Sequence, residues 1–100
     1  MSESHPLAGC RVFVVEDDYF ISDDLANFLT AAGATVVGPV SQIDLAMDQV
    51  KIDEFEVVVL DINLRNEMSY SVADELRRQK IPFIFATGYD KKPTQSVLRA

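Results

Sequence analysis

Acidic side chains follow two of the most apolar segments of this chain, at the point where each segment ends. Residues 57–60, VVVL, are followed at once by Asp61, and residues 11–15, RVFVV, are followed by the acids EDD at 16–18. A carboxylate beside a buried strand is costly, because burial penalises its charge. Acids in this position therefore call for a chemical or structural reason.

Two neighbouring parallel strands would bring these acids together. The carboxyl ends of parallel strands share one edge of the sheet, so Asp61 would face Glu16 and Asp17. Three such carboxylates repel, and either one keeps a proton or a cation binds between them. Oxygen ligands without His or Cys favour a hard cation, Mg²⁺ or Mn²⁺. With a hydroxyl donor such as Thr87, which follows residues 81–86, these are the parts for moving a phosphoryl group onto Asp61.

Each of these residues also has a plainer structural interpretation. Asp17 or Asp18 would serve equally well as the N-cap of a helix that follows. Thr87 stands before Gly88 and would also suit an ordinary loop. Asp61 is harder to explain without a function, and the occurrence of all three positions at one sheet edge is a more specific signal than any one of them.

The segments between the acids alternate between strand and helix patterns. Short apolar runs predict four strands, at residues 11–15, 34–38, 55–60 and 81–86. Apolar residues at helical spacing predict three helices, with faces Ile21, Leu25, Phe28, Leu29 and Ala32, then Ile43, Ala46, Met47 and Val50, and then a helix over residues 70–79. The order predicts a single α/β domain of parallel strands over residues 9–100, after an N-terminal leader at 1–8.

Turn and capping residues refine these boundaries. Gly33 stands where the first helix should stop, and Pro39 should close the second strand. Ser41 and Asp44 resemble a capping box at the start of the second helix. Two more segments complete the prediction, a polar loop at residues 63–69 and a fourth helix that begins near Pro93.

Composition excludes several classes of protein. A net charge of −7 argues against a nucleic-acid-binding surface. With one cysteine, Cys10, and one histidine, His5, neither an internal disulfide nor a Cys/His metal cluster can form. No apolar run has the length of a signal peptide or a membrane span, so we expect a cytoplasmic protein that binds neither nucleic acid nor membrane. The mildly basic part of the chain, residues 71–100, is expected to form a solvated helical surface rather than a docking patch.

The motifs RVFVVEDD, VVVLDINL and PFIFATGYD, each at the end of an expected strand, resemble the response-regulator receiver domain of bacterial two-component signalling. The resemblance covers nearly all of residues 9–100. The segment NEMSYSVADELRRQKIPFIFATGYD also resembles a single-domain subgroup with a Phe-Ala-Thr-Gly-Tyr motif, common in alphaproteobacteria. The family implies a flavodoxin-like, doubly wound parallel sheet in the order 2-1-3-4-5.

The resemblance also implies roles for individual residues. Asp61 would accept a phosphoryl group from a sensor histidine kinase or a phosphotransfer protein, as one step of a phosphorelay. Thr87 would sense the phosphate, and Tyr89 is a candidate switch residue, with a plain surface aromatic as the alternative. The implied magnesium ligands are Glu16, Asp17, Asp61 and the backbone carbonyl of Asn63, with Asp18 outside the set.

The resemblance further implies a signalling protein rather than an enzyme. We expect only phosphoryl transfer to Asp61 itself and its autodephosphorylation. The implied output is contact with a downstream protein partner, because no output domain follows within these residues.

The sequence departs from the family near its C-terminus. Receivers carry a lysine after a fifth strand, whereas Lys91 and Lys92 come too soon after Thr87 to take that place. The fifth strand and its helix are expected to be absent, which would expose the edge of the strand at 81–86. We therefore expect either a fragment of a longer protein, or a homodimer or swapped assembly that covers this edge.

Two other functions compete with an active receiver. A degenerate receiver would keep the fold, lack phosphorylation and only bind partners. A phosphatase of the haloacid-dehalogenase type also uses an apolar strand that ends in a nucleophilic Asp with Mg²⁺. Its motif has a second Asp two residues later, where this sequence has Asn63, and its nucleophile usually ends the first core strand.

Overall fold

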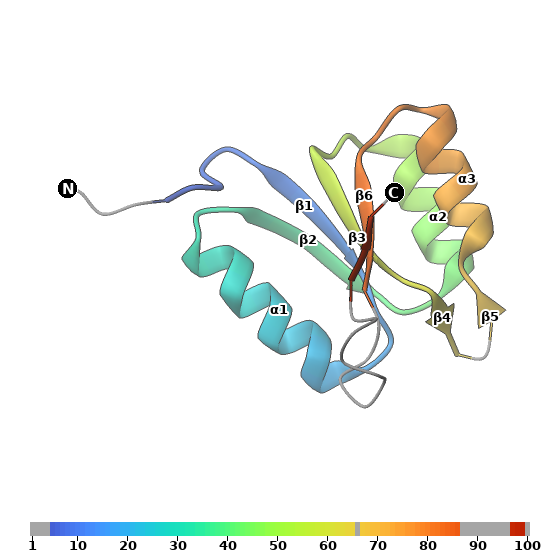
Figure 1. Cartoon of the computed structure of the whole chain (residues 1–100), viewed down its shortest axis with the longest axis horizontal. Helices are drawn as coiled ribbons and strands as arrows, with labels where there is room; N and C mark the ends of the chain where they lie inside the picture. The colour runs from blue at the N-terminus through green and yellow to red at the C-terminus, as the bar shows by residue number, and fades with distance from the viewer. Residues whose placement is uncertain (1–4, 66, 87–96, 100) are drawn as a thin grey trace.

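The computed structural model describes residues 5–65, 67–86 and 97–99, in which a sheet lies between α1 on one face and α2 and α3 on the other (Figure 1). The strands are β1 (Arg11–Val15), β2 (Thr35–Val40), β3 (Val57–Asp61), β4 (Asn63–Leu64), β5 (Glu67–Met68), β6 (Phe83–Ala86) and β7 (Val97–Arg99). The helices are α1 (Tyr19–Ala31), α2 (Ile43–Ile52) and α3 (Tyr70–Arg78). None of the helices in the described ranges is long and apolar enough to cross a membrane.

The main sheet has the strand order β2-β1-β3-β6-β7. The pairs β1–β2, β1–β3 and β3–β6 are parallel. With β6 as the fourth predicted strand, this confirms the expected order 2-1-3-4. Val15 lies opposite Leu60, so the residues that follow β1 emerge beside the end of β3.

The central strands are apolar because both of their faces are covered. Val12 of β1 belongs to one core cluster together with Leu29 of α1. Phe13 of β1 belongs to another, with Val50 of α2 and Leu76 of α3. Successive residues of a strand point to opposite faces, so a strand covered on both sides reads as a continuous apolar run.

The first helix begins at a capping aspartate. The carboxylate of Asp18 accepts hydrogen bonds from the backbone N–H groups of Phe20 at 2.9 Å and Ile21 at 3.1 Å. The capping alternative is therefore correct for Asp18. Gly33, with φ 101°, follows the end of α1 as predicted. Phe28 was expected on the buried face but is 68% exposed, which corrects that assignment.

Two boundary predictions around the second strand are wrong. The strand continues through Pro39 to Val40, because β2 is an edge strand where a missing N–H is tolerated. The Val40 carbonyl accepts a hydrogen bond from the Glu16 N–H at 3.0 Å, which ties the ends of β2 and β1 together. The capping box at Ser41 is also absent, since the N-cap of α2 is Gln42 and its side chain makes no capping bond.

Two segments take a different secondary structure from the one predicted. The segment expected to be a polar loop contains an antiparallel hairpin, in which Asn63 of β4 pairs with Met68 of β5. The fourth helix is wrong over residues 97–99, which form β7, antiparallel to β6. The edge of β6 is therefore paired with β7 of this chain, so the expected exposed edge is wrong, while the homodimer or swapped assembly stays a prediction. Among the described residues no parallel fifth strand is present.

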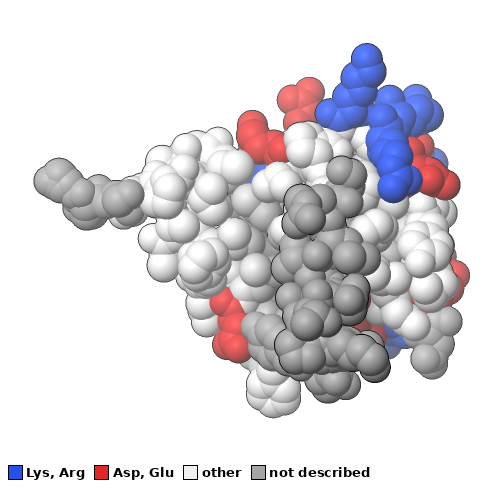
Figure 2. Space-filling model, in the orientation of Figure 1, with Lys and Arg blue, Asp and Glu red and all other residues white. Residues whose placement is uncertain are grey.

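The basic end of α3 is a solvated surface, as predicted. Arg77 lies 3.2 Å from Asp74 and Arg78 lies 2.5 Å from Glu75, and the two arginine side chains are 57% and 70% exposed. Figure 2 shows Lys and Arg side chains with acids among them at the corner of the molecule where α3 ends. Both ion pairs join residues of the same helix, and neither involves the acids at the carboxyl ends of β1 and β3.

We predict that Gly38→Ala destabilises the fold more than Gly9→Ala. Both glycines have positive φ, 94° and 80°, so both substitutions strain the backbone. At Gly38 a Cβ would also lie 2.8 Å from the Val14 carbonyl oxygen, whereas at Gly9 it would meet nothing within 4 Å.

The expected difference in the free energy of unfolding is about 1–3 kcal/mol, the usual cost of forcing extra atoms into a packed region. Urea unfolding of the two variants and the parent protein measures it. Equal losses of unfolding free energy in the two variants would show that the close approach of residue 38 to the Val14 carbonyl oxygen adds nothing to the cost of the substitution.

Candidate functional site

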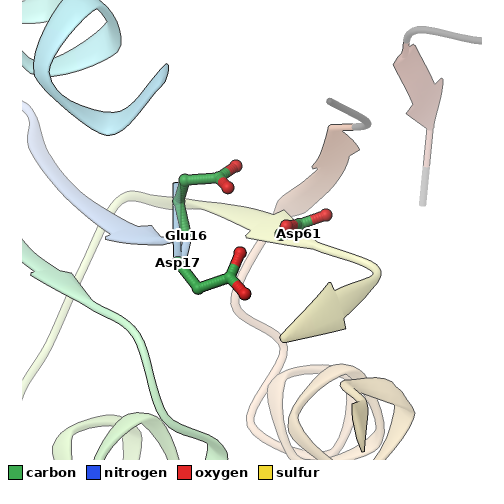
Figure 3. Close-up of side chains that lie close together, drawn as sticks. All are labelled: Glu16, Asp17 and Asp61. Atoms are coloured by element: carbon green, nitrogen blue, oxygen red, sulfur yellow. The ribbon is translucent and has the colours of Figure 1, made fainter. Parts of the chain in front are cut away.

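Three of the predicted site residues lie together at the carboxyl ends of β1 and β3. Glu16, Asp17 and Asp61 each offer one carboxylate oxygen, and these oxygens all lie within 4.8 Å of one another. Figure 3 shows Glu16 and Asp17 projecting from the end of β1 towards Asp61 at the end of β3. The adjacency of β1 and β3 in the sheet produces this arrangement.

The three carboxylates differ in burial and in hydrogen bonding. Glu16 is only 6% exposed and accepts a hydrogen bond from the Asp18 N–H at 3.0 Å. Asp61 is half-buried, and its Oδ1 lies 3.5 Å from the Asn63 N–H, a long contact. Asp17 is exposed, and its Oδ2 accepts a hydrogen bond from the backbone N–H of Arg65 at 2.8 Å.

Burial and mutual repulsion raise the affinity of this site for protons. Burial is the main reason why the pKa of Glu16 rises to about 7, and the neighbouring Asp61 charge adds to the rise. Burial also raises the pKa of Asp61, against the hydrogen bond with Glu16, which lowers it. Near neutral pH, Glu16 therefore carries a proton for part of the time unless a cation neutralises the cluster.

A buried serine holds the backbone of Asp61. The Ser69 hydroxyl lies 2.5 Å from the Asp61 carbonyl oxygen and 3.0 Å from the Ile62 carbonyl oxygen, and the side chain is 0% exposed. Ser69 is the N-cap residue of α3, yet its side chain makes no capping bond. The hydroxyl instead joins the start of α3 to the end of β3.

Sequence reasoning missed both Ser69 and Arg65. A polar residue just before a predicted helix suggests a cap, a signal that would not have led to the contact of Ser69 with the Asp61 carbonyl. Arg65 bonds to Asp17 through its backbone N–H, for which the residue type gives no signal.

Only some of the remaining predicted residues lie in the described part of the chain. Asn63 lies at the start of β4, two residues after Asp61, with an exposed side chain. Thr87, Tyr89, Lys91 and Lys92 lie outside the described residues. Their predicted roles therefore stay predictions.

The residues present fit a hard divalent cation. The donor set is three carboxylates, a combination that suits Mg²⁺ or Mn²⁺ rather than zinc or copper. When fully ionised the cluster carries three negative charges, and among the described residues no arginine or lysine side chain forms an ion pair with it. A divalent cation would supply the missing positive charge.

The sequence is similar to known signalling proteins. The family model described as response regulator receiver domain matches residues 12–99. The sensory transduction protein LytT of Bacillus subtilis (strain 168) is 30% identical over 84 residues, which cover 81% of this chain and 35% of LytT. The chain spans about a third of the length of the curated relatives it matches.

Solved structures have the same fold. SdrG from Sphingomonas melonis Fr1 is 32% identical, with a TM-score of 0.75, over 86% of this chain and 76% of SdrG. The receiver domain of the sensor histidine kinase PA1611 from Pseudomonas aeruginosa PAO1, solved with a magnesium ion in its active-site cleft, has a TM-score of 0.73 over 88% of this chain and 75% of its own. That domain is 21% identical, and its likeness concerns the fold. From its sheet order, its sequence and its structural neighbours, this chain belongs to the response regulator receiver domain family of two-component signalling.

Proposed function

We propose that this receiver accepts a phosphoryl group on Asp61 from the phosphohistidine of a sensor kinase or a phosphotransfer protein. The observation that supports the proposal most directly is the convergence of three carboxylate oxygens within 4.8 Å, at a position where burial raises the pKa of two of them. The proposed Mg²⁺ ligands are Glu16, Asp17, Asp61 and the backbone carbonyl of Asn63.

Asp61 is suited to act as the nucleophile. Its carboxylate is half-buried at the end of β3, so it is fixed by the strand and still open to a partner. One oxygen of Asp61 would attack phosphorus, the phosphorus–nitrogen bond of the phosphohistidine would break, and the released imidazole would take up a proton. Mg²⁺, when bound, neutralises the charge that gathers between the carboxylates and the phosphoryl oxygens.

The other residues of the site would position the reacting groups. Ser69 holds the carbonyl of Asp61, and the hydrogen bond from Asp18 holds the carboxylate of Glu16. The β3–β6 register sets Ala86 beside Asp61, and Thr87 is the next residue along the chain. This supports a hydroxyl role for Thr87 towards a phosphoryl group, with Tyr89 two residues beyond as a candidate switch residue.

Two alternatives make different chemical demands. A degenerate receiver would bind its partners without forming an acyl phosphate. A phosphatase would turn over many substrate molecules, and it is disfavoured by Asn63 in place of a second Asp and by the position of Asp61 on the third strand of the chain. We propose instead a cytoplasmic signalling domain whose phosphorylation changes its contact with a downstream protein.

We predict that the wild-type protein is phosphorylated once by a small phosphodonor such as acetyl phosphate in the presence of Mg²⁺, and that Asp61→Asn is not. The amide lacks the nucleophilic carboxylate oxygen, and no second residue of the site is expected to replace it. Intact-protein mass spectrometry measures the added phosphoryl group. The matched control is Asp24→Asn, an exposed position on α1, which should be labelled like the wild type.

Each other outcome identifies an alternative. Labelling of Asp61→Asn would refute Asp61 as the acceptor. A wild-type protein that binds Mg²⁺ without being labelled would be a degenerate receiver. Repeated hydrolysis of a phosphate ester would favour the phosphatase.

We predict that Mg²⁺ stabilises the protein increasingly as the pH rises from about 6 to 8. The folded-state pKa of Glu16, about 7, lies above its ordinary value of 4.5. Protonated Glu16 therefore stabilises the folded, metal-free protein. This contribution to the free energy of unfolding is fully present below about pH 4.5 and is lost as the pH rises through 7. Mg²⁺ needs the ionised carboxylates, so its binding competes with the proton.

Thermal unfolding with Mg²⁺ or with a chelator measures this effect. At a Mg²⁺ concentration a hundred times its Kd the gain in unfolding free energy should be about 2.7 kcal/mol. Glu16→Gln should weaken both the gain and its pH dependence. A gain that is constant or falls with rising pH would contradict the coupling between proton and cation.

A further inference from the structure

Asp17 is the least fixed of the three acids by burial, and it is held instead by a residue far away in the sequence. Its side chain is exposed, whereas Glu16 is buried and Asp61 half-buried. Within the described part of the chain, the hydrogen bond that its carboxylate accepts comes from the N–H of Arg65, 48 residues further on, at 2.8 Å. The position of the Asp17 carboxylate therefore depends on where the backbone of Arg65 lies.

The backbone at Arg65 adopts a conformation that L residues seldom take. Its φ is 50°, in the left-handed region, directly after β4 and before the hairpin returns as β5. Glycine or asparagine usually occupies such a position in a tight hairpin, because a Cβ is unfavourable there. An arginine at this position suggests that its side chain contributes a contact that glycine cannot make.

The guanidinium of Arg65 makes that contact with the end of β2. Its Nε lies 3.3 Å from the carbonyl oxygen of Ser41, and its Nη2 lies 3.3 Å from the Ser41 hydroxyl. Ser41 directly follows Val40, whose carbonyl accepts the hydrogen bond from Glu16. Arg65 thus connects three segments at one sheet edge, namely the β4–β5 hairpin, the end of β2 and the acids after β1.

We propose that Arg65 is a positioning residue that holds the Asp17 carboxylate in place for Mg²⁺ binding. This inference rests on the proposed metal site. The guanidinium anchors the hairpin to Ser41, and the anchored backbone N–H orients Oδ2 of Asp17. A carboxylate has two oxygens, so Asp17 can keep this bond and still offer its other oxygen to the cation. An exposed side chain that is already oriented loses less freedom when it binds.

The direction in which one substitution changes the affinity for Mg²⁺ distinguishes this role from a simple electrostatic effect. Arg65→Gly removes the guanidinium but keeps the N–H and suits the positive φ. Removal of a positive charge near three carboxylates would by itself tighten Mg²⁺ binding. If Arg65 positions Asp17, binding should instead weaken by about tenfold, as for other groups that orient metal ligands.

The experiment is a Mg²⁺ titration followed by the amide NMR spectra of the wild type, Arg65→Gly, Ser41→Ala and Arg78→Gln. Arg65→Gly should bind Mg²⁺ about tenfold more weakly, with a melting temperature of the metal-free protein no lower than that of the wild type. Ser41→Ala should weaken binding by a smaller factor, because the Ser41 carbonyl remains. Arg78→Gln, at the far end of α3, loses the same charge and should bind like the wild type.

A second measurement does not depend on the cation. The amide of residue 65 should have a larger protection factor against hydrogen exchange in the metal-free wild type than in Arg65→Gly. The reason is that the hydrogen bond from this N–H to Asp17 is formed for more of the time in the wild type. Equal exchange in the two proteins, or Mg²⁺ binding in Arg65→Gly that is unchanged or tighter, would overturn the inference. Failure of the wild type itself to bind Mg²⁺ would instead refute the proposed metal site.

Discussion

The parallel pairing of β1 with β3 is the constraint on which the site depends. Val15 lies opposite Leu60, so the next side chains of both strands emerge at the same level of the sheet edge. Both faces of β1 are buried, so the register is set by packing: a slip of one residue would move Phe13 out of the cluster it shares with α2 and α3 and into the one beside α1. The apolar packing of the two faces thus holds together carboxylates whose charges would otherwise drive them apart.

The central strands and their acidic ends are predictable from the sequence because local pattern and burial agree there. Strand β1 has the predicted bounds, Arg11–Val15, and β6 lies within the predicted run 81–86. The convergence of Glu16, Asp17 and Asp61 follows from two facts that can be read in the sequence, an acid directly after each apolar run and an alternating order of strands and helices.

The features that were not predictable depend on partners far away in the sequence. Pro39 looks like the end of a strand, but the edge position of β2 tolerates it. The local pattern of residues 97–99 predicts a helix, whereas the edge of β6 offers N–H and C=O groups with which these residues pair as β7. The link from Arg65 to Asp17 uses a backbone donor, which every residue type except proline supplies.

The bond between Ser69 and the Asp61 carbonyl has a mechanical consequence. The carboxylate of Asp61 belongs to the acidic cluster, and its carbonyl oxygen accepts a hydrogen bond from the buried hydroxyl of Ser69, the N-cap residue of α3. Because that hydroxyl is fully buried and its other acceptor, the Ile62 carbonyl, belongs to the next residue of the same segment, a shift of the main chain at Asp61 and Ile62 must either break these bonds or draw the beginning of α3 along with it. A displacement of Asp61 at the acidic cluster is therefore transmitted directly to α3, a helix on the outside of the molecule.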